Sequence, residues 1–246
     1  DIDSFNFLHA MWPRLTIGSA VDWNGDGSPN GPWILEGQEC LVFFTGGIPS
    51  SGSPATTLGF SPNPANPAAA VTGGTRKGPY YPYDSSRLLR NASTNFLSYA
   101  DPLSGKPYAY FSSFSYWSKA PLAAGGVLVP VPNRYGPTGA TPVGNTGVSD
   151  CNSLGVSPYA DVATNPTVAN PPIPHYLNAD TFQIISAGAD GVFGQGSMNN
   201  SSSYDCSWSP NTAGKTMATA VAGGNNPKAA ARNMANFYSN LLGIAP

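Results

Sequence analysis

The sequence is poor in charged side chains. Its 246 residues include 11 lysines and arginines and 13 aspartates and glutamates, so only 10% are charged and the formal net charge is −2. An average soluble domain carries about 25% charged residues. So few cations offer no basic surface for a phosphate backbone, and we expect no nucleic-acid partner. A weakly charged surface also repels its own copies weakly, which favours self-association.

Long hydrophobic runs are absent as well. No apolar run approaches the roughly 18 to 20 residues that span a bilayer; the longest candidates are residues 40–44 and 127–131. We therefore expect no membrane-spanning segment in the chain as given. The chain also begins at Asp1 without an initiator methionine or a signal peptide, which we interpret as the loss of an upstream segment.

Cysteine is scarce. Three cysteines allow at most one intrachain disulfide. Cys40 lies in an apolar run, where we expect it to remain a small buried thiol. Cys151 and Cys206 lie in similar polar contexts, DCN and DCS, and we predict that these two residues form a disulfide. Such a bond suits an oxidising compartment.

Glycine and proline, in contrast, are abundant, with 28 and 25 residues. Both interrupt regular structure, which excludes helical bundles and doubly wound α/β sheets. The hydrophobic fraction of 41% and the aromatic fraction of 11% are too high for a disordered chain. Composition therefore indicates a folded domain with many loops. An ordinary secreted domain fits it as well as a protein that packs against its own copies.

The residue pattern predicts a few short helices. Apolar side chains at helical spacing predict a helix over residues 3–12 that ends at Pro13. Residues 36–46 read as a second helix that stops at the Gly46-Gly47 pair, with a buried strand as the alternative. Residues 228–242 predict a helix or helical turn that closes the chain.

Strand signals are also short. Two aromatic-rich alternating runs in residues 96–112, around a turn at 101–105, predict a β-hairpin. Residues 182–186 predict a strand that a tight turn over 187–194 follows. Residues 48–78 and 119–174 are rich in glycine and proline, and we predict long loops there. Since neither a repeat nor a linker divides the chain, we predict one domain over residues 1–246.

Catalytic patterns are not evident. The two histidines, His9 and His175, lie far apart in unlike contexts, which argues against a histidine metal cluster. No serine lies in a Gly-x-Ser-x-Gly elbow, and Glu36 and Glu39 have no acid that the sequence places opposite them. We therefore predict that the protein is not an enzyme.

The strongest local chemical signal is the sequence DWNGDG at residues 22–27, which matches the opening of a calcium loop. Oxygen ligands at alternate positions and glycine at the sixth position suit a hard cation. The match ends at the twelfth position, where Trp33 replaces the usual glutamate, and Glu36 comes three positions late. The alternative is a turn held by its own Asx hydrogen bonds. The candidate calcium ligands are Asp22, Asn24, Asp26, Ser28 and Asn30.

Two segments, in this order, resemble segments of the major pseudopilins of type II secretion. Residues 101–108 (DPLSGKPY) are similar to a Asp-Pro-Trp-Gly-x-Pro-Tyr hairpin, and residues 182–194 (FQIISAGADGVFG) to a Ser-x-Gly-Ala-Asp-Gly-x-x-Gly turn. The likeness is closer for a branch of large, loop-elaborated type IV pilin-like proteins with prepilin-type N-termini, common in planctomycete-like bacteria. Residues 12–16, 22–27, 39–47 and 58–64 also read like that branch.

The resemblance implies an α+β fold, a pilin-like head with a small antiparallel sheet, short flanking helices and long Gly/Pro-rich loop insertions. It also implies that a long N-terminal hydrophobic helix is missing from this chain. In pseudopilins the Gly-Ala-Asp-Gly turn holds a structural calcium, which implies Ala187 as a carbonyl ligand and Asp190 as a side-chain ligand. Ser197 and Met198 stand where further acids are expected, so Asp205 would have to replace them.

The same resemblance implies a structural subunit of a type IV pilus-like or type II secretion pseudopilus-like filament, extracellular or at the cell surface, and periplasmic if it is a pseudopilus. Its partners would be its own copies and the secretion or pilus assembly machinery, with the membrane reached only through the missing helix. Candidate subunit contacts are the loop aromatics Tyr80, Tyr81, Tyr83, Tyr116 and Trp117; for each, the alternative is the domain's own core. The competing function is a secreted calcium-dependent carbohydrate- or surface-binding module.

Overall fold

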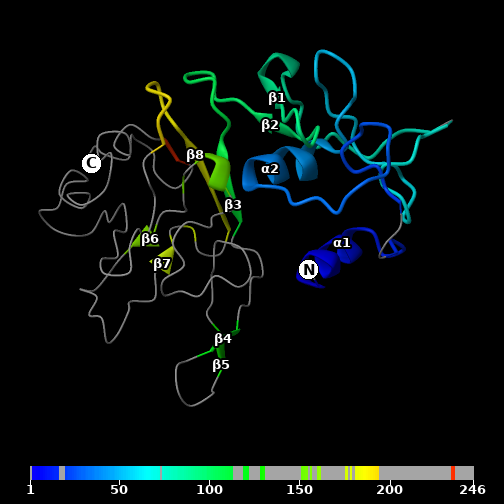
Figure 1. Cartoon of the computed structure of the whole chain (residues 1–246), viewed down its shortest axis with the longest axis horizontal. Helices are drawn as coiled ribbons and strands as arrows, with labels where there is room; N and C mark the ends of the chain where they lie inside the picture. The colour runs from blue at the N-terminus through cyan, green and yellow to red at the C-terminus, as the bar shows by residue number, and fades with distance from the viewer. Residues whose placement is uncertain are drawn as a thin grey trace, which may run out of the picture. The chain divides into compact units, whose positions relative to one another are not determined.

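The structure, a computed structural model, describes residues 2–16, 20–72, 74–112, 119–121, 128–130, 151–154, 156, 160–161, 175–176, 178, 181–193 and 234–235. It combines α-helices with short antiparallel strands, which confirms the predicted α+β class (Figure 1). The chain divides into two compact units. The first unit is Asp1–Leu35 with Glu39–Ala100, and the second is Glu36–Gln38 with Asp101–Pro246. The single domain over residues 1–246 stays a prediction.

Helix α1 spans Ile2–Met11, as the sequence predicts. Proline cannot continue a helix because it lacks the backbone N–H, and α1 ends just before Pro13. Beyond the helix, the Leu15 N–H donates to the Trp12 carbonyl at 2.9 Å, which turns the chain so that Trp12 and Leu15 are both buried. Trp12 therefore anchors the end of α1 in the core of the first unit.

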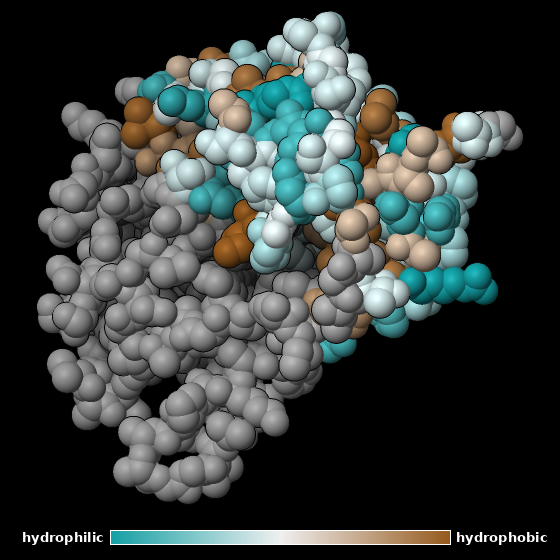
Figure 2. Space-filling view, turned by 45° about the vertical axis from the view of Figure 1, so that its right-hand side comes forward, coloured by the Kyte–Doolittle hydropathy of each residue, from teal (hydrophilic) through white to brown (hydrophobic). Residues whose placement is uncertain are grey.

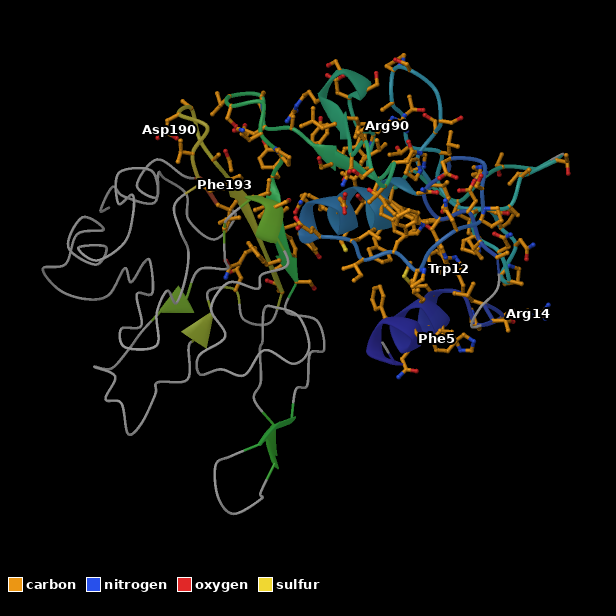
Figure 3. The ribbon with its side chains drawn as sticks, viewed as in Figure 1. Phe5, Trp12, Arg14, Arg90, Asp190 and Phe193 are labelled. Carbon is orange, nitrogen blue, oxygen red and sulfur yellow. The ribbon has the colours of Figure 1, made fainter. Side chains whose placement is uncertain are left out.

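The core of the first unit is largely aromatic. Its buried residues are Trp12, Leu15, Val21, Phe43, Ile48, Phe60 and Phe96. The Phe43 ring makes edge contacts with the rings of Phe60 and Phe96, at centroid distances of 5.4 and 5.7 Å. Trp12 contacts Phe60 in the same way at 5.0 Å, and Figure 3 shows where it lies beside α1. Edge-to-face aromatic pairs stabilise beyond the area that they bury, so this cluster fixes α1, α2 and the neighbouring loops together.

Helix α2 spans Gly37–Gly46, which confirms the helix and rules out the strand alternative. Val42 and Phe43 point into the core and are buried. The helix ends at Gly47, whose φ of +91° lies in the left-handed region, and the Gly47 N–H donates to the Phe43 carbonyl at 2.8 Å. The predicted glycine stop is confirmed, since such a left-handed residue is the common end of a helix.

The predicted loop over residues 48–78 contains no helix or named strand in its described part. Isolated bridges hold it instead, from Pro49 to Thr57 and from Phe60 to Lys77. The Arg76 guanidinium donates to the carbonyls of Gly59 and Ala69, each at 3.2 Å. Backbone carbonyls that are removed from water need such partners, so Arg76 stabilises this loop, which has no regular structure.

The predicted hairpin over residues 96–112 is wrong. Strand β2 (Leu97–Tyr99) pairs with β1 (Leu88–Arg90), whereas β3 (Ala109–Ser112) pairs with β8 (Phe182–Ser186). Both predicted runs are strands and a turn does join them, because the Gly105 N–H donates to the Asp101 carbonyl at 2.8 Å. Alternation predicts that a segment is a strand, but burial in the tertiary structure selects its partner.

The sheet of the second unit has the order β3-β8-β9. Ala109 lies opposite Ile185 in the antiparallel register of β3 and β8, and Ala109, Phe111 and Ile185 are fully buried. Strand β9 is Met234–Ala235, paired with the end of β8. The helix predicted over 228–242 is therefore wrong at these two residues, because pairing along β8 overrides a local helical pattern. The rest of that segment lies outside the described residues.

Short elements also interrupt the predicted loop over residues 119–174. Strands β4 (Lys119–Pro121) and β5 (Leu128–Pro130) pair with each other, as do β6 (Ala160–Asp161) and β7 (His175–Tyr176). A 3₁₀ turn, η2, spans Asn152–Leu154, and another, η1 (Ser85–Arg87), precedes β1 in the first unit. The loop prediction is wrong at β4, β5 and β6, whereas β7 lies just beyond its end. In the described part of the chain, no helix is both long and apolar enough to cross a membrane.

Candidate functional site

Asp101 is a buried carboxylate, 2% exposed, that begins the turn after β2. Its Oδ1 accepts the Leu103 N–H at 3.2 Å, and its Oδ2 accepts the Ser104 hydroxyl at 3.0 Å. The Ser186 hydroxyl, at the end of β8, donates to Oδ2 at 2.8 Å. A buried charge needs several hydrogen bonds to offset its lost hydration, and Asp101 obtains them from two segments that lie 85 residues apart.

The turn after β8 is tied to the same carboxylate. The Ser186 oxygen accepts the Gly188 N–H at 2.9 Å while its hydroxyl donates to Asp101. Gly188 and Gly191 have φ of +70° and +68°, and the Gly191 N–H donates to the Gly188 carbonyl at 3.2 Å. The predicted tight turn is confirmed over residues 187–193. We call residues 101–106 and 186–191 the paired turns.

The calcium that the resemblance implies at the second of the paired turns finds few ligands there. Asp190 lies at the tip of the turn (Figure 3), and its Oδ1 accepts the Val192 N–H at 3.2 Å. Ala187 is fully buried, and Asp205, like Ser197 and Met198, lies outside the described residues. No three His, Cys, Asp or Glu side chains cluster at a metal distance in the described residues. These residues alone do not make a cation site, and we derive no chemistry from one.

The loop of residues 22–30 has the hydrogen bonds of an Asx turn. Asp22 accepts the N–H groups of Asp26 and Gly27 at 3.1 and 2.9 Å. Asp26 accepts the Ser28 N–H at 2.7 Å and the side-chain amides of Asn24 and Asn30 at 2.9 and 3.1 Å. These bonds, led by that of Asn24, lower the pKa of Asp26 below its usual value. The loop thus brings the predicted ligands Asp22, Asn24, Asp26 and Asn30 together, whereas Ser28 contributes its backbone N–H.

Asn24 is the buried member of this loop, 1% exposed. Its side-chain Nδ2 donates to the Thr94 carbonyl at 2.8 Å, and the backbone carbonyl of Asn24 accepts the Asn95 side-chain amide at 2.5 Å. Asn95 has a φ of +66°. Sequence reasoning missed Thr94 and Asn95, because nothing in the local pattern links residues 70 positions apart.

The structure describes two of the three cysteines, Cys40 and Cys151. Cys151 is fully buried, and its thiol donates to the Tyr110 carbonyl at 3.3 Å. Cys206 lies outside the described residues, so the disulfide between these two residues stays a prediction. Cys40 is half-buried rather than fully buried, and its sulfur lies 3.9 Å from the Leu35 carbonyl oxygen.

The loop tyrosines differ in exposure. Tyr80 and Tyr81 are 68% and 49% exposed. Tyr83 is half-buried, with its hydroxyl 2.6 Å from the Thr45 hydroxyl and its ring centroid 4.8 Å from that of Tyr99. Tyr83 thus fits the core alternative, while Tyr80 and Tyr81 remain available to a partner. Tyr116 and Trp117 lie outside the described residues. On the face that Figure 2 shows, hydrophobic residues form separate spots among hydrophilic and intermediate ones.

Comparison with protein-family models, with curated proteins and with solved structures found no match. A function must therefore be argued from the residues and contacts of the chain itself.

Proposed function

We propose that this chain is the globular part of a structural subunit of a type IV pilus-like or type II secretion pseudopilus-like filament. The observation that carries the proposal is the hydrogen bond from Ser186 to Asp101. It joins the two segments whose sequences resemble pseudopilin motifs, residues 101–108 and 182–194. Segments that occur in order by chance have no reason to share one buried carboxylate.

The strand pairing supports the same proposal. Strand β3 follows the first motif and β8 begins the second, and these two strands are antiparallel neighbours. The paired turns therefore lie at one end of the sheet (Figure 1). Among the described residues, the Asp101 carboxylate accepts hydrogen bonds from neutral hydroxyl and N–H donors. Such a carboxylate is suited to holding the paired turns rigidly together. A rigid head is what a filament subunit needs on its outer surface.

Exposed apolar side chains give the proposed subunit a means of contact. Tyr80 and Tyr81 present aromatic rings to solvent, and tyrosine is enriched at protein interfaces because its ring is apolar and its hydroxyl is polar. A surface with few charges offers little repulsion between copies. In this proposal these loops contact neighbouring subunits of the filament.

The test is electron microscopy of cells that make the natural full-length gene product, labelled with an antibody against this chain. We expect filaments with label at a regular axial spacing. The Tyr80→Ala/Tyr81→Ala double variant should reduce filament number severalfold. The melting temperature of the head should fall only modestly, because Tyr80 is 68% exposed and Tyr81, 49% exposed, loses ring contacts with Tyr83 and Tyr99. The matched control is Leu103→Ala, which removes a side chain that is 58% exposed on the first of the paired turns.

Two results would contradict the proposal. One is label that stays diffuse at the cell surface or in the medium, with no filament. The other is label on filaments that persist unchanged when the gene for this chain is deleted. Diffuse label together with retention on a polysaccharide column, lost in the double tyrosine variant, would favour the secreted binding module, for which the exposed tyrosines are the observation in favour.

A further inference from the structure

The side-chain oxygen of Asn24 is a buried acceptor without a hydrogen-bond partner. The residue is 1% exposed, and an amide oxygen in such a position normally has a partner because its desolvation is costly. The amide nitrogen of the same side chain contacts Asp26 Oδ2 at 2.9 Å. The orphan oxygen is bonded to the same carbon as this nitrogen, so it lies within one amide group of the Asp26 carboxylate.

Rotating the amide cannot satisfy this oxygen. An exchange of the two amide atoms would place the oxygen against Asp26 Oδ2 and the Thr94 carbonyl, the present acceptors of Nδ2. Two acceptors then face a third, which is repulsive. The orientation is therefore fixed by its neighbours, and no donor among the described residues meets the oxygen, which leaves it open to an electropositive group.

The two aspartates favour a cation over a water molecule as that group. Asp22 and Asp26 accept hydrogen bonds from backbone N–H groups and neutral side-chain amides. A carboxylate oxygen has more than one acceptor site, so these bonds orient the carboxylates and still leave lone pairs for a metal. Gly25 and Gly27, with φ of +66° and +92°, allow the sharp turn over which positions 22, 24 and 26 follow one another.

We propose that residues 22–30 bind one calcium ion, with Asp22 and Asp26 as charged ligands and Asn24 as the buried neutral ligand. Oxygen donors at alternate positions are what a hard cation takes. The site has two carboxylates, and Trp33 stands where a bidentate glutamate would complete it. Its dissociation constant is therefore expected in the weak range, about 10⁻⁴ to 10⁻³ M. This site lies apart in sequence from the turn at Asp190 and does not depend on the filament.

The experiment is a calcium titration of the 246-residue chain after removal of metal with EDTA, followed by calorimetry and by thermal unfolding. At a calcium concentration about a hundredfold above the dissociation constant, the melting temperature should rise by about 5–10 °C. Sodium chloride at equal ionic strength is the reference and should produce a much smaller shift. Terbium provides a second readout, because Trp23 in the loop can sensitise its luminescence, and calcium should displace it.

Substitutions test whether residues 22–30 are the calcium site. Asp22→Asn should abolish the calcium shift, and Asn24→Asp should lower the melting temperature without calcium but tighten binding roughly tenfold through the added charge. Asp84→Asn is the matched control, since Asp84 also accepts a backbone N–H two residues on, from Ser86, but lies outside the loop; it should keep the full shift. The proposal is overturned if the unaltered chain gives neither heat nor displaceable terbium luminescence. An equal calcium shift in Asp22→Asn and the unaltered chain would also overturn it.

Discussion

Tyr83 shows how burial alters a single side chain. Its hydroxyl lies against Thr45 and donates to the Leu41 carbonyl at 3.3 Å. Burial disfavours the phenolate and raises the pKa of Tyr83, while the Thr45 hydrogen bond acts in the opposite direction and is the smaller effect. The folded protein therefore holds the Tyr83 proton more tightly than the unfolded chain does.

This difference predicts a loss of stability at alkaline pH. The contribution of Tyr83 is fully present below the unfolded pKa of about 10 and is lost as the pH rises through the higher folded pKa. Urea unfolding of the unaltered protein and of Tyr83→Phe at pH 8 and pH 11 measures it. At pH 8 the variant should be less stable by about 1 kcal/mol because its hydrogen bonds are gone, and this gap should narrow at pH 11. A gap that stays constant would contradict the prediction.

Asp101 is a residue whose neighbours the sequence alone did not reveal. Asp101→Ala removes the acceptor of the Ser186 and Ser104 hydroxyls and leaves buried donors without a partner. We expect the free energy of unfolding to fall by about 3 kcal/mol, measured by urea unfolding. Asp190→Ala, on the exposed tip of the other turn, is the control and should cost much less. Equal losses in the two variants would mean that the paired turns are not joined through Asp101.

At the scale of elements, the end of α2 depends on two glycines that touch. A Cβ on Gly47 would lie 2.3 Å from the Cα of Gly59, in addition to requiring a side chain at a φ of +91°. Gly105 also has a positive φ, +70°, but a Cβ there would meet no atom within 4 Å. The two positions therefore separate backbone strain from steric overlap.

Alanine substitutions measure the two effects. Gly105→Ala should cost about 1 kcal/mol of unfolding free energy, the penalty of a left-handed alanine. Gly47→Ala should cost about 3 kcal/mol or more, because overlap with Gly59 adds to the same penalty. Chemical unfolding followed by far-UV circular dichroism compares them, and a Gly47→Ala cost no larger than that of Gly105→Ala would contradict the close approach.

The strands show why elements are easier to predict than their pairing. Residues 97–99, 109–112 and 182–186 are strands, as the sequence predicts. The expected hairpin between the first two is absent, because β1 and β8 are their partners. A short strand buries too little surface alone to choose its neighbour, so distant segments of the chain decide the pairing. Met234–Ala235 illustrates the same effect, since these residues lie in a segment with a helical sequence pattern but form a strand that pairs with β8.

At the scale of the whole molecule, low charge is the property that governs association. The chain has a formal net charge of −2 and a sequence pI near 5.5. Near that pH the few charges cancel, and proteins with little net charge associate readily. Light scattering at constant protein concentration between pH 4 and pH 8 should therefore reach a maximum near pH 5.5. Scattering that is flat across this range, or highest at pH 8, would contradict the prediction.

The sequence by itself determined helices α1 and α2, the glycine stop of α2 and the turn after β8. These features depend on neighbouring residues, through periodicity, proline and glycine, and such local effects act within a few residues of the chain. Only the tertiary structure decided the partners of β2 and β3, the burial of Asn24 against Thr94, and the bond from Ser186 to Asp101. These contacts join residues far apart in the chain, and burial rather than local preference selects them.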